Sequence, residues 1–184
     1  MLKLDRDNCL PGLVARRKVL RLYLFTVYCL LIPMVRIVLV NPEIPPNTGN
    51  IARSCAATKT ELHLVAPLGF EISDRYLKRA GLDYWPLVKL HYHEDLAAFW
   101  QEHRQKGGRL IGFSVRGTKN YLDCQYQATD WLLFGKETAG LPPEVTSVCN
   151  ELVRIDIAEP RVRSLNLSVS VSVGLFEAIR QLNK

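Results

Sequence analysis

The chain has 184 residues, of which 48% are hydrophobic and 23% are charged. These proportions are those of a globular protein, and they exclude a disordered or fibrous chain. The length fits one domain with a substantial core. The formal net charge is +6, but residues 1–33 carry +4 of it and the rest of the chain only +2. Net charge therefore does not identify a nucleic-acid-binding protein, and a face for RNA would have to come from local clusters of basic residues.

Cysteine and histidine spacing give no sign of a disulfide framework or a metal site. The five cysteines are odd in number and include no Cys-x-x-Cys pair, whereas such sites need closer, paired spacing. We therefore expect reduced, mostly buried thiols in a cytoplasmic protein. His91 and His93 are spaced to share one strand face, but the sequence offers no further ligands nearby, so we expect no metal.

The first 33 residues differ from the remainder. Residues 20–32 are apolar apart from one arginine and follow a basic run at 16–18, as in a signal peptide. The apolar run is shorter than the roughly 20 residues of a membrane span, and no small-residue cleavage site is evident. We interpret residues 1–33 as an N-terminal extension outside the native domain, with Met34 as its start and no membrane partner. A weak membrane-surface or partner-binding role is the alternative if the extension is made.

From Met34 onward, strand and helix patterns alternate. Short apolar runs predict buried strands at residues 35–40, 62–66, 87–92, 110–115, 131–134 and 152–157. Helices are predicted at 51–58, after Asp74, at 96–103 before Gly107 and Gly108, and, as a short helix, from Pro142 and Pro143. This alternation predicts an α/β fold with a mostly parallel sheet flanked by helices.

The C-terminal segment has two possible structures. Residues 165–173 alternate apolar and polar side chains with period two, which formally predicts a strand. The serines and valines of the same run also repeat at i, i+4, and residues 176–182 favour a helix. The pattern alone leaves strand and helix open.

Three loops carry residues typical of ligand binding. The first, P-P-N-T-G-N-I-A-R at 45–53, follows the first strand, where α/β sheets bind ligands. Residues 47–50 are expected to cap a helix, and Gly49 permits close backbone approach or positive φ. Arg53, one turn into that helix, is placed to bind a phosphate. The alternative is a plain turn with a surface arginine.

The second loop, F-G-K-E-T-A-G-L-P at 134–142, has two glycines around Glu137. Its spacing differs from the dinucleotide fingerprint G-x-G-x-x-G. Exposed backbone N–H and C=O groups could instead hold an adenosine moiety. The alternative is a tight left-handed turn at Gly140.

The third loop, R-V-R-S-L-N-L-S at 161–168, precedes the final segment. Ser164, Asn166 and Ser168 are short hydrogen-bonding side chains suited to capping and to ligand contact, and Arg161 and Arg163 add a basic cluster. A well-capped helix N-terminus is the alternative.

In this order along the chain, the three motifs resemble the signatures of the SPOUT superfamily of RNA methyltransferases. The segments at 41–53 and R-A-G-L-D-Y at 79–84 are most similar to the branch that methylates the ribose 2′-hydroxyl of the tRNA wobble nucleotide. The resemblance extends from Met34 to about Leu182. It implies that the C-terminal segment is a helix and that the fold contains a C-terminal deep trefoil knot, a feature nearly absent from proteins.

The resemblance also implies a cofactor, S-adenosyl-L-methionine, and a homodimer. The cofactor pocket would be formed by Phe113, Gly135, Ile155, Ser164 and Leu165. Arg53 and Asn166 would be the catalytic residues. Arg53 would contact the target phosphate and ribose, in an orienting and electrostatic role because a guanidinium stays protonated. Asn166 would be its orienting partner, and the general base stays open.

Five basic residues are candidates to hold the anticodon stem-loop of tRNA: Arg75, Lys78, Arg79, Arg161 and Arg163. Solvated surface charges are the alternative for them. Phe176 stands where relatives often have a tyrosine, which bears on substrate preference. The same chemistry on ribosomal RNA and a catalytically silent RNA-binding dimer are the alternative functions, and intact Arg53, Asn166 and Gly135 argue against a silent dimer.

Overall fold

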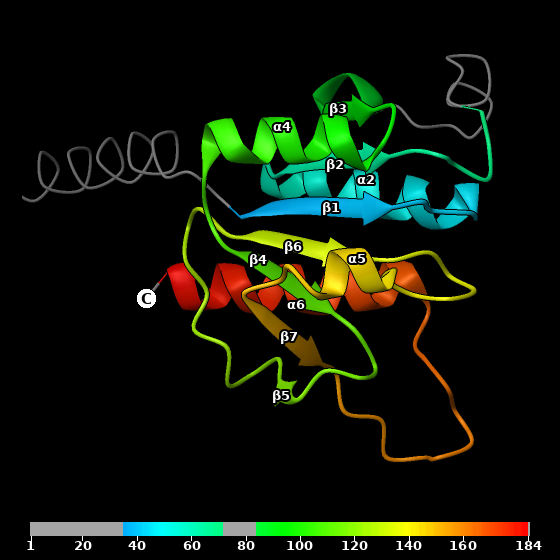
Figure 1. Cartoon of the computed structure of the whole chain (residues 1–184), viewed down its shortest axis with the longest axis vertical. Coiled ribbons are helices and arrows are strands. Elements are labelled where there is room, and N and C mark those ends of the chain that lie inside the picture. The colour runs from blue at the N-terminus through cyan, green and yellow to red at the C-terminus, as the bar shows by residue number, and fades with distance from the viewer. Residues whose placement is uncertain (1–34, 72–83, 184) are drawn as a thin grey trace, which may run out of the picture. The chain divides into compact units, whose positions relative to one another are not determined.

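The computed structural model describes residues 35–71 and 84–183, which belong to one compact unit, Met34–Lys184 (Figure 1). The extension at residues 1–33 and the helix predicted after Asp74 lie outside the described residues.

Seven parallel strands form one sheet in the order β3-β2-β1-β6-β4-β7-β5. The strands are β1 (Arg36–Val40), β2 (Glu61–Val65), β3 (Lys89–His93), β4 (Leu110–Phe113), β5 (Lys119–Asn120), β6 (Trp131–Phe134) and β7 (Glu151–Arg154). The predicted strands are confirmed with small shifts of their ends. Their apolar runs are legible in the sequence because β1, β4 and β6 are covered on both faces. Sequence reasoning missed β5, because a pair of polar residues carries no strand pattern.

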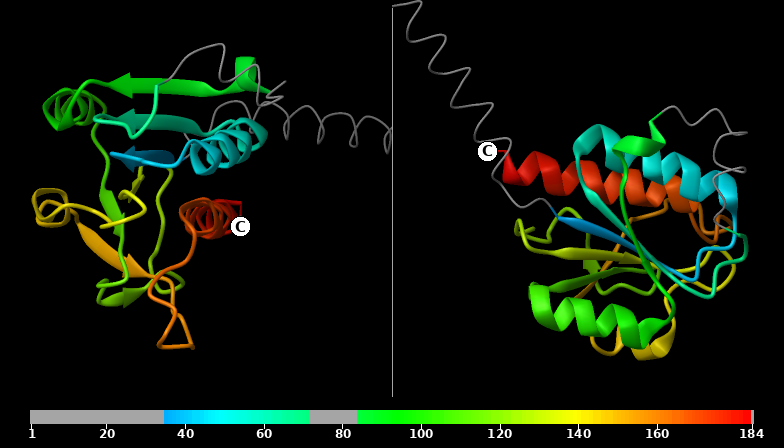
Figure 2. Two further views of the ribbon diagram at one scale, coloured as in Figure 1. Left: turned by 90° about the vertical axis from the view of Figure 1, so that its right-hand side faces the viewer. Right: turned by 90° about the horizontal axis from the view of Figure 1, so that it is seen from above.

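Helices cover both faces of the sheet, as Figure 2 shows: α2 and α6 lie on one face, and α4 and α5 on the other. They are α2 (Pro45–Thr58), α4 (Leu96–Lys106), α5 (Pro143–Thr146) and α6 (Leu167–Leu182), with a 3₁₀ turn, η1 (Trp85–Leu87). The predicted α/β class is thus confirmed. The chain builds β1, β2 and β3 outward and then returns past β1 to place β4, so the connections diverge next to the centre of the sheet.

The predicted start of α2 at residue 51 is wrong. The helix begins at Pro45, and Ile44 is its N-cap, with no side-chain cap. Proline fits the first helical positions because its φ is already helical and its missing N–H has no partner there. Residues 47–50 are therefore helical instead of capping, and Gly49 does not have a positive φ. Arg53 consequently lies farther into the helix than expected.

The C-terminal segment is helical, so the strand indicated by its period-two pattern is wrong. Its buried residues recur at helical spacing, namely Leu167, Val171, Gly174, Leu175, Glu177 and Ala178. Two serine hydroxyls donate to carbonyl oxygens one turn earlier, Ser170 to Asn166 at 3.2 Å and Ser172 to Ser168 at 2.8 Å. This bonding lets serines occupy a helix without an unpaired hydroxyl.

The expected buried thiols are confirmed in the described part of the chain. Cys55 and Cys124 are buried and Cys149 is half-buried, and all three are unpaired. Burial raises the pKa of the Cys55 thiol to about 12. Among the described residues, no helix has both the length and the apolar character that crossing a membrane requires.

Two glycine substitutions test the packing. A Cβ at Gly117 would overlap the backbone of Val153 in β7, whereas a Cβ at Gly49 would meet nothing within 4 Å. We expect Gly117→Ala to lower the free energy of unfolding by about 1–3 kcal/mol through overpacking. Gly49→Ala is the matched control and should raise it by about 0.5–1 kcal/mol, because glycine is a poor helix former. Urea unfolding measures both, and equal midpoints for the two variants would contradict the packing described.

Candidate functional site

A cavity of about 1100 Å³ lies at the carboxyl ends of the central strands. Its wall includes Asn41 after β1, Ser114 after β4, Gly135 after β6 and Ile155 after β7. In open α/β sheets, ligands bind outside these strand ends, where the connections diverge. We refer to this cavity as the strand-end pocket.

The structure brings the predicted cofactor residues together. Phe113, Gly135, Ile155, Ser164 and Leu165 all line the strand-end pocket. They come from the end of β4, the loop after β6, the segment after β7 and the approach to α6. Segments far apart in sequence thus converge on one pocket, while the role of each residue stays a prediction.

The loop after β6 turns back on itself at the pocket. The backbone N–H of Gly140 donates to the carbonyl of Lys136 at 2.8 Å, and Gly140 has a φ of +72°. The left-handed turn considered for Gly140 is therefore present. A Cβ at Gly135 would overlap the backbone of Gly140, so glycine alone fits where the two arms of the loop meet.

Glu137 joins this loop to the start of α2. Its carboxylate accepts hydrogen bonds from the backbone N–H groups of Glu43 at 2.8 Å and Ile44 at 3.2 Å, and from the side-chain amide of Asn47 at 2.9 Å. Backbone N–H groups at a helix start lack partners within the helix, and the helix dipole favours an anion there. Glu137 therefore stabilises a helix start that has no side-chain cap of its own.

In a second contact between the same segments, the loop after β6 is the donor and the segment before α2 is the acceptor. Thr138 donates to the Glu43 carboxylate through its hydroxyl at 2.7 Å and its backbone N–H at 3.3 Å. The hydrogen bond from the hydroxyl lowers the pKa of the Glu43 carboxyl. Sequence reasoning missed both glutamates, and the only signal was the position of Glu137 between two glycines.

Asn166 links the third motif to the first. The side-chain N–H of Asn166 donates to the side-chain carbonyl of Asn47 at 2.9 Å. The side-chain carbonyl oxygen of Asn166 accepts from the backbone N–H of Ser168 at 2.9 Å and from the Ser168 hydroxyl at 2.7 Å. The expected capping role is thus confirmed for Asn166. Since Asn47 also contacts Glu137, a continuous chain of side chains, Glu137–Asn47–Asn166, joins all three motifs.

Arg53 does not line the strand-end pocket. It is exposed on α2, about 9 Å along the helix axis from Asn47 at 1.5 Å per residue. Its guanidinium carbon lies 4.7 Å from the ring centroid of Tyr84, whose hydroxyl donates to the carbonyl of Gly49 at 3.0 Å. A cation–π contact of this kind restricts the guanidinium while leaving its edges available. The importance of Tyr84 was not foreseen beyond its place in the segment at 79–84.

The structure places the predicted RNA-binding residues in different surroundings. Arg163 lines the strand-end pocket. Arg161 is 89% exposed and forms an ion pair with Glu159 at 2.8 Å, which neutralises part of the expected basic cluster. Arg75, Lys78 and Arg79 lie outside the described residues. Arg116 and Lys136 also line the pocket, and sequence reasoning missed them because isolated basic residues in loops form no pattern.

The doubly wound parallel sheet and the strand-end pocket define an α/β protein of the kind whose ligand sites lie where the connections diverge. The model of the SpoU rRNA methylase family matches residues 34–176. The chain therefore belongs to this family of RNA methyltransferases, as the resemblance in its motifs implied.

Three known proteins show how close the similarity is. A Synechocystis protein, provisionally named a tRNA (cytidine(34)-2′-O)-methyltransferase, is 61% identical over 149 residues, 81% of this chain and 97% of that protein. A solved structure concerned with 2-OH methylation of C/U34 on tRNA is 47% identical with a TM-score of 0.76, covering 82% of this chain and 97% of the other. An AdoMet-bound rRNA methyltransferase from Sinorhizobium meliloti is 27% identical with a TM-score of 0.73, covering 81% and 57% respectively.

The role of Glu137 can be tested by exchanging its carboxylate for an amide. Glu137→Gln replaces a charged acceptor of three N–H donors with a weaker one, and we expect the free energy of unfolding to fall by about 2 kcal/mol. Faster hydrogen exchange at the amides of Glu43 and Ile44 should accompany the loss. The matched control is Glu144→Gln at an exposed position, and an equal effect in both variants would contradict the assignment.

Proposed function

We propose that the protein transfers a methyl group from S-adenosyl-L-methionine to the ribose 2′-hydroxyl of the wobble nucleotide of tRNA, a cytidine or a modified uridine. The observation that carries the proposal is the convergence of five predicted cofactor residues on the strand-end pocket. The names of the first two relatives given above, which concern nucleotide 34 of tRNA, support the choice of substrate.

The residues present fit this cofactor. The pocket volume of about 1100 Å³ accommodates a nucleoside with an amino-acid tail. Phe113, Ile155 and Leu165 offer apolar surface suited to an adenine ring, and the glycine-containing loop after β6 offers backbone N–H and C=O groups. The bound cofactor would supply the methyl group on a sulfonium, which already carries a good leaving group.

The protein's own contribution is then to position the reacting groups. Arg53 would bind the phosphate and ribose of the target nucleotide and would stay protonated, so it acts by orientation and charge. Tyr84 would hold the Arg53 guanidinium, given the 4.7 Å contact between them. Asn166, which donates a 2.9 Å hydrogen bond to Asn47 and lines the strand-end pocket, would orient the reactants there.

The remaining partners are also part of the proposal. Arg161 and Arg163, together with Arg75, Lys78 and Arg79, would hold the anticodon stem-loop. A homodimer would form over the exposed face of α6, where Val169 is 48% and Phe176 52% exposed. Such an apolar face is typical of a protein interface.

We further propose that the segment through α6 forms a deep trefoil knot and that the enzyme acts in the cytoplasm, where its tRNA substrate is found. Residues 1–33 would lie outside the methyltransferase domain, since the family match begins at residue 34.

Cofactor binding is the first test. Gly135→Ala cannot keep the loop after β6 closed, because the new Cβ would overlap Gly140. We expect calorimetry to show S-adenosylmethionine binding by the unchanged protein and at least about a tenfold loss in this variant, the equivalent of 1.4 kcal/mol. Gly49→Ala is the matched control and should bind normally. If Gly135→Ala binds the cofactor as tightly as the unchanged protein, the assignment of the cofactor to this pocket is contradicted.

Methyl transfer is the second test. The protein is incubated with S-adenosylmethionine and tRNA lacking the wobble methyl group, and 2′-O-methyl nucleosides are mapped by mass spectrometry. We expect a methyl group at the wobble ribose, and a loss of about 10²–10³ in rate for Arg53→Ala, the range for a positioned charge-stabilising group.

The Arg53→Ala variant also needs its cofactor binding measured, and this should be unchanged because Arg53 does not line the pocket. If the unchanged protein binds the cofactor but does not methylate tRNA, the tRNA assignment is refuted and the assay moves to ribosomal RNA. No cofactor binding at all would favour a silent RNA-binding protein.

A further inference from the structure

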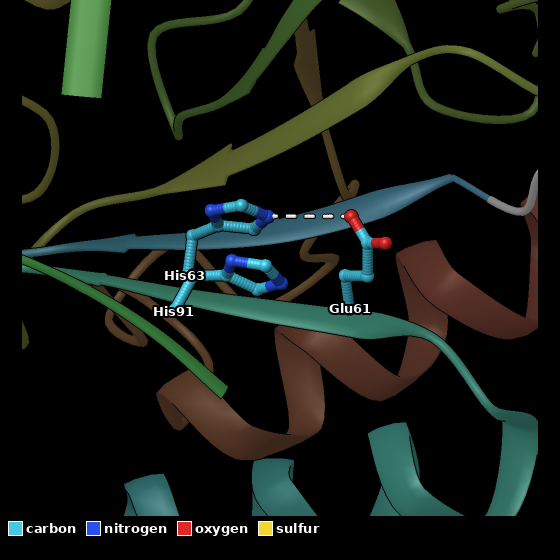
Figure 3. A group of neighbouring side chains, drawn as sticks. All are labelled: Glu61, His63 and His91. Carbon is cyan, nitrogen blue, oxygen red and sulfur yellow. Dashed lines mark ion pairs between the residues drawn. The ribbon is translucent and has the colours of Figure 1, made fainter. Parts of the chain in front are cut away.

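A group of potential metal ligands lies on β2 and β3, on the sheet face that α4 covers. One ligand atom from each of Glu61, His63 and His91 lies within 4.8 Å of the others, and Figure 3 shows the three side chains together. None of them lines the strand-end pocket. The sequence offers no further ligands near His91 and His93, and the structure brings potential ligands to His91 from β2.

The backbone register holds these residues together. His63 on β2 is the direct partner of His91 on β3, and their rings stack with centroids 4.4 Å apart and planes 11° apart. Glu61 precedes His63 by two residues, so both side chains point to the same face of the sheet. The group is therefore fixed by the pairing of two strands, and not by the chance approach of flexible side chains.

His63 carries the observation that points to a ligand. The residue is fully buried, and its Nε2 has no hydrogen-bond partner among the described residues. This atom lies 3.7 Å from a carboxylate oxygen of Glu61, and the two are joined by the dashed line in Figure 3. A buried polar atom without a partner is costly, about 1–3 kcal/mol, and a bound cation would satisfy it.

The other nitrogen of His63 is already held. Its Nδ1 lies 3.0 Å from Nε2 of His93, which in turn is 3.7 Å from a carboxylate oxygen of Glu102. Metal-binding histidines are oriented in this way, by a partner at the nitrogen that does not face the metal.

Two neighbouring cations limit the affinity. Arg36 and Lys106 contact the same oxygen of Glu61, at 3.1 Å and 3.4 Å. They would repel an incoming cation, although Glu102 offsets Lys106 through a 2.8 Å ion pair. Glu61 and His91 are 30% and 35% exposed at their side chains, which leaves a solvent-facing side where water can complete the coordination.

We propose that Glu61, His63 and His91 bind a divalent transition-metal ion of the Zn²⁺ class. Two imidazoles, one carboxylate and a water molecule form a common four-coordinate set for this ion. Such an ion connects edge strand β3 to β2, away from the strand-end pocket, and therefore stabilises the folded chain without taking part in the methyl transfer.

The test uses the full chain without an affinity tag, freed of metal by a chelator and titrated with Co²⁺ and Zn²⁺ by calorimetry and absorption spectroscopy. We expect one ion per chain and a higher Tm in its presence, since a ligand that binds only the folded state stabilises it. His91→Ala and Glu61→Gln should each weaken binding at least about tenfold, the lower end of losses at metal sites. Circular dichroism verifies that both variants are folded.

The matched control is His103→Ala. His103 is the one remaining histidine of the chain's four and contacts the carbonyl of Gly108 at 3.0 Å, apart from the proposed ligands. This variant should bind as the unchanged protein does, whereas Lys106→Met should bind more tightly because a repelling charge is gone. Absence of binding, equal binding in His91→Ala, or the intense near-ultraviolet bands of thiolate-bound Co²⁺ would each overturn the proposal.

Discussion

The arrangement of the pocket depends on the hydrogen bonds that the carboxylate of Glu137 accepts at the start of α2. Helix α2 begins with two prolines, which have no N–H, behind an Ile44 that has no side-chain cap to offer. The N–H groups that need an acceptor from elsewhere are therefore those of Glu43 and Ile44, just before the helix. That acceptor comes from a loop 94 residues away along the chain. Through Asn47 the same carboxylate fixes Asn166, the residue that caps α6. One acidic side chain thus helps to position α2, α6 and the loop after β6 relative to one another.

Most of the fold could be predicted from the sequence because its strands are buried on both faces. Runs such as Trp131–Phe134 are apolar throughout, and their hydrophobicity directly reports their burial. The beginning of α2 could not be predicted in this way, since Pro45 and Asn47 suit either a loop or a helix start, and a carboxylate distant in sequence selects the helix. Helix α6 remained open for a similar reason, because serine bonding one turn back is invisible to a polar–apolar pattern.

The site was predictable in its residues and less so in its connections. The resemblance implied Phe113, Gly135 and Asn166 as site residues, and all three line the strand-end pocket. Sequence reasoning had no means of finding the contact between Tyr84 and Arg53, or the bridging role of Asn47. The histidine group on β2 and β3 was overlooked because strand register, which brings His63 beside His91, is a property of the sheet and not of local spacing.

The bond between Asn166 and Asn47 joins residues 119 positions apart, and this separation has a consequence for how the chain matures. Contacts so distant in sequence form late, after much loop entropy has been lost. A chain emerging from synthesis therefore has no pocket until its last helix has docked. A molecule that binds this pocket therefore binds the folded chain and not the unfolded one, and it stabilises the fold by an amount that rises with its concentration relative to its Kd.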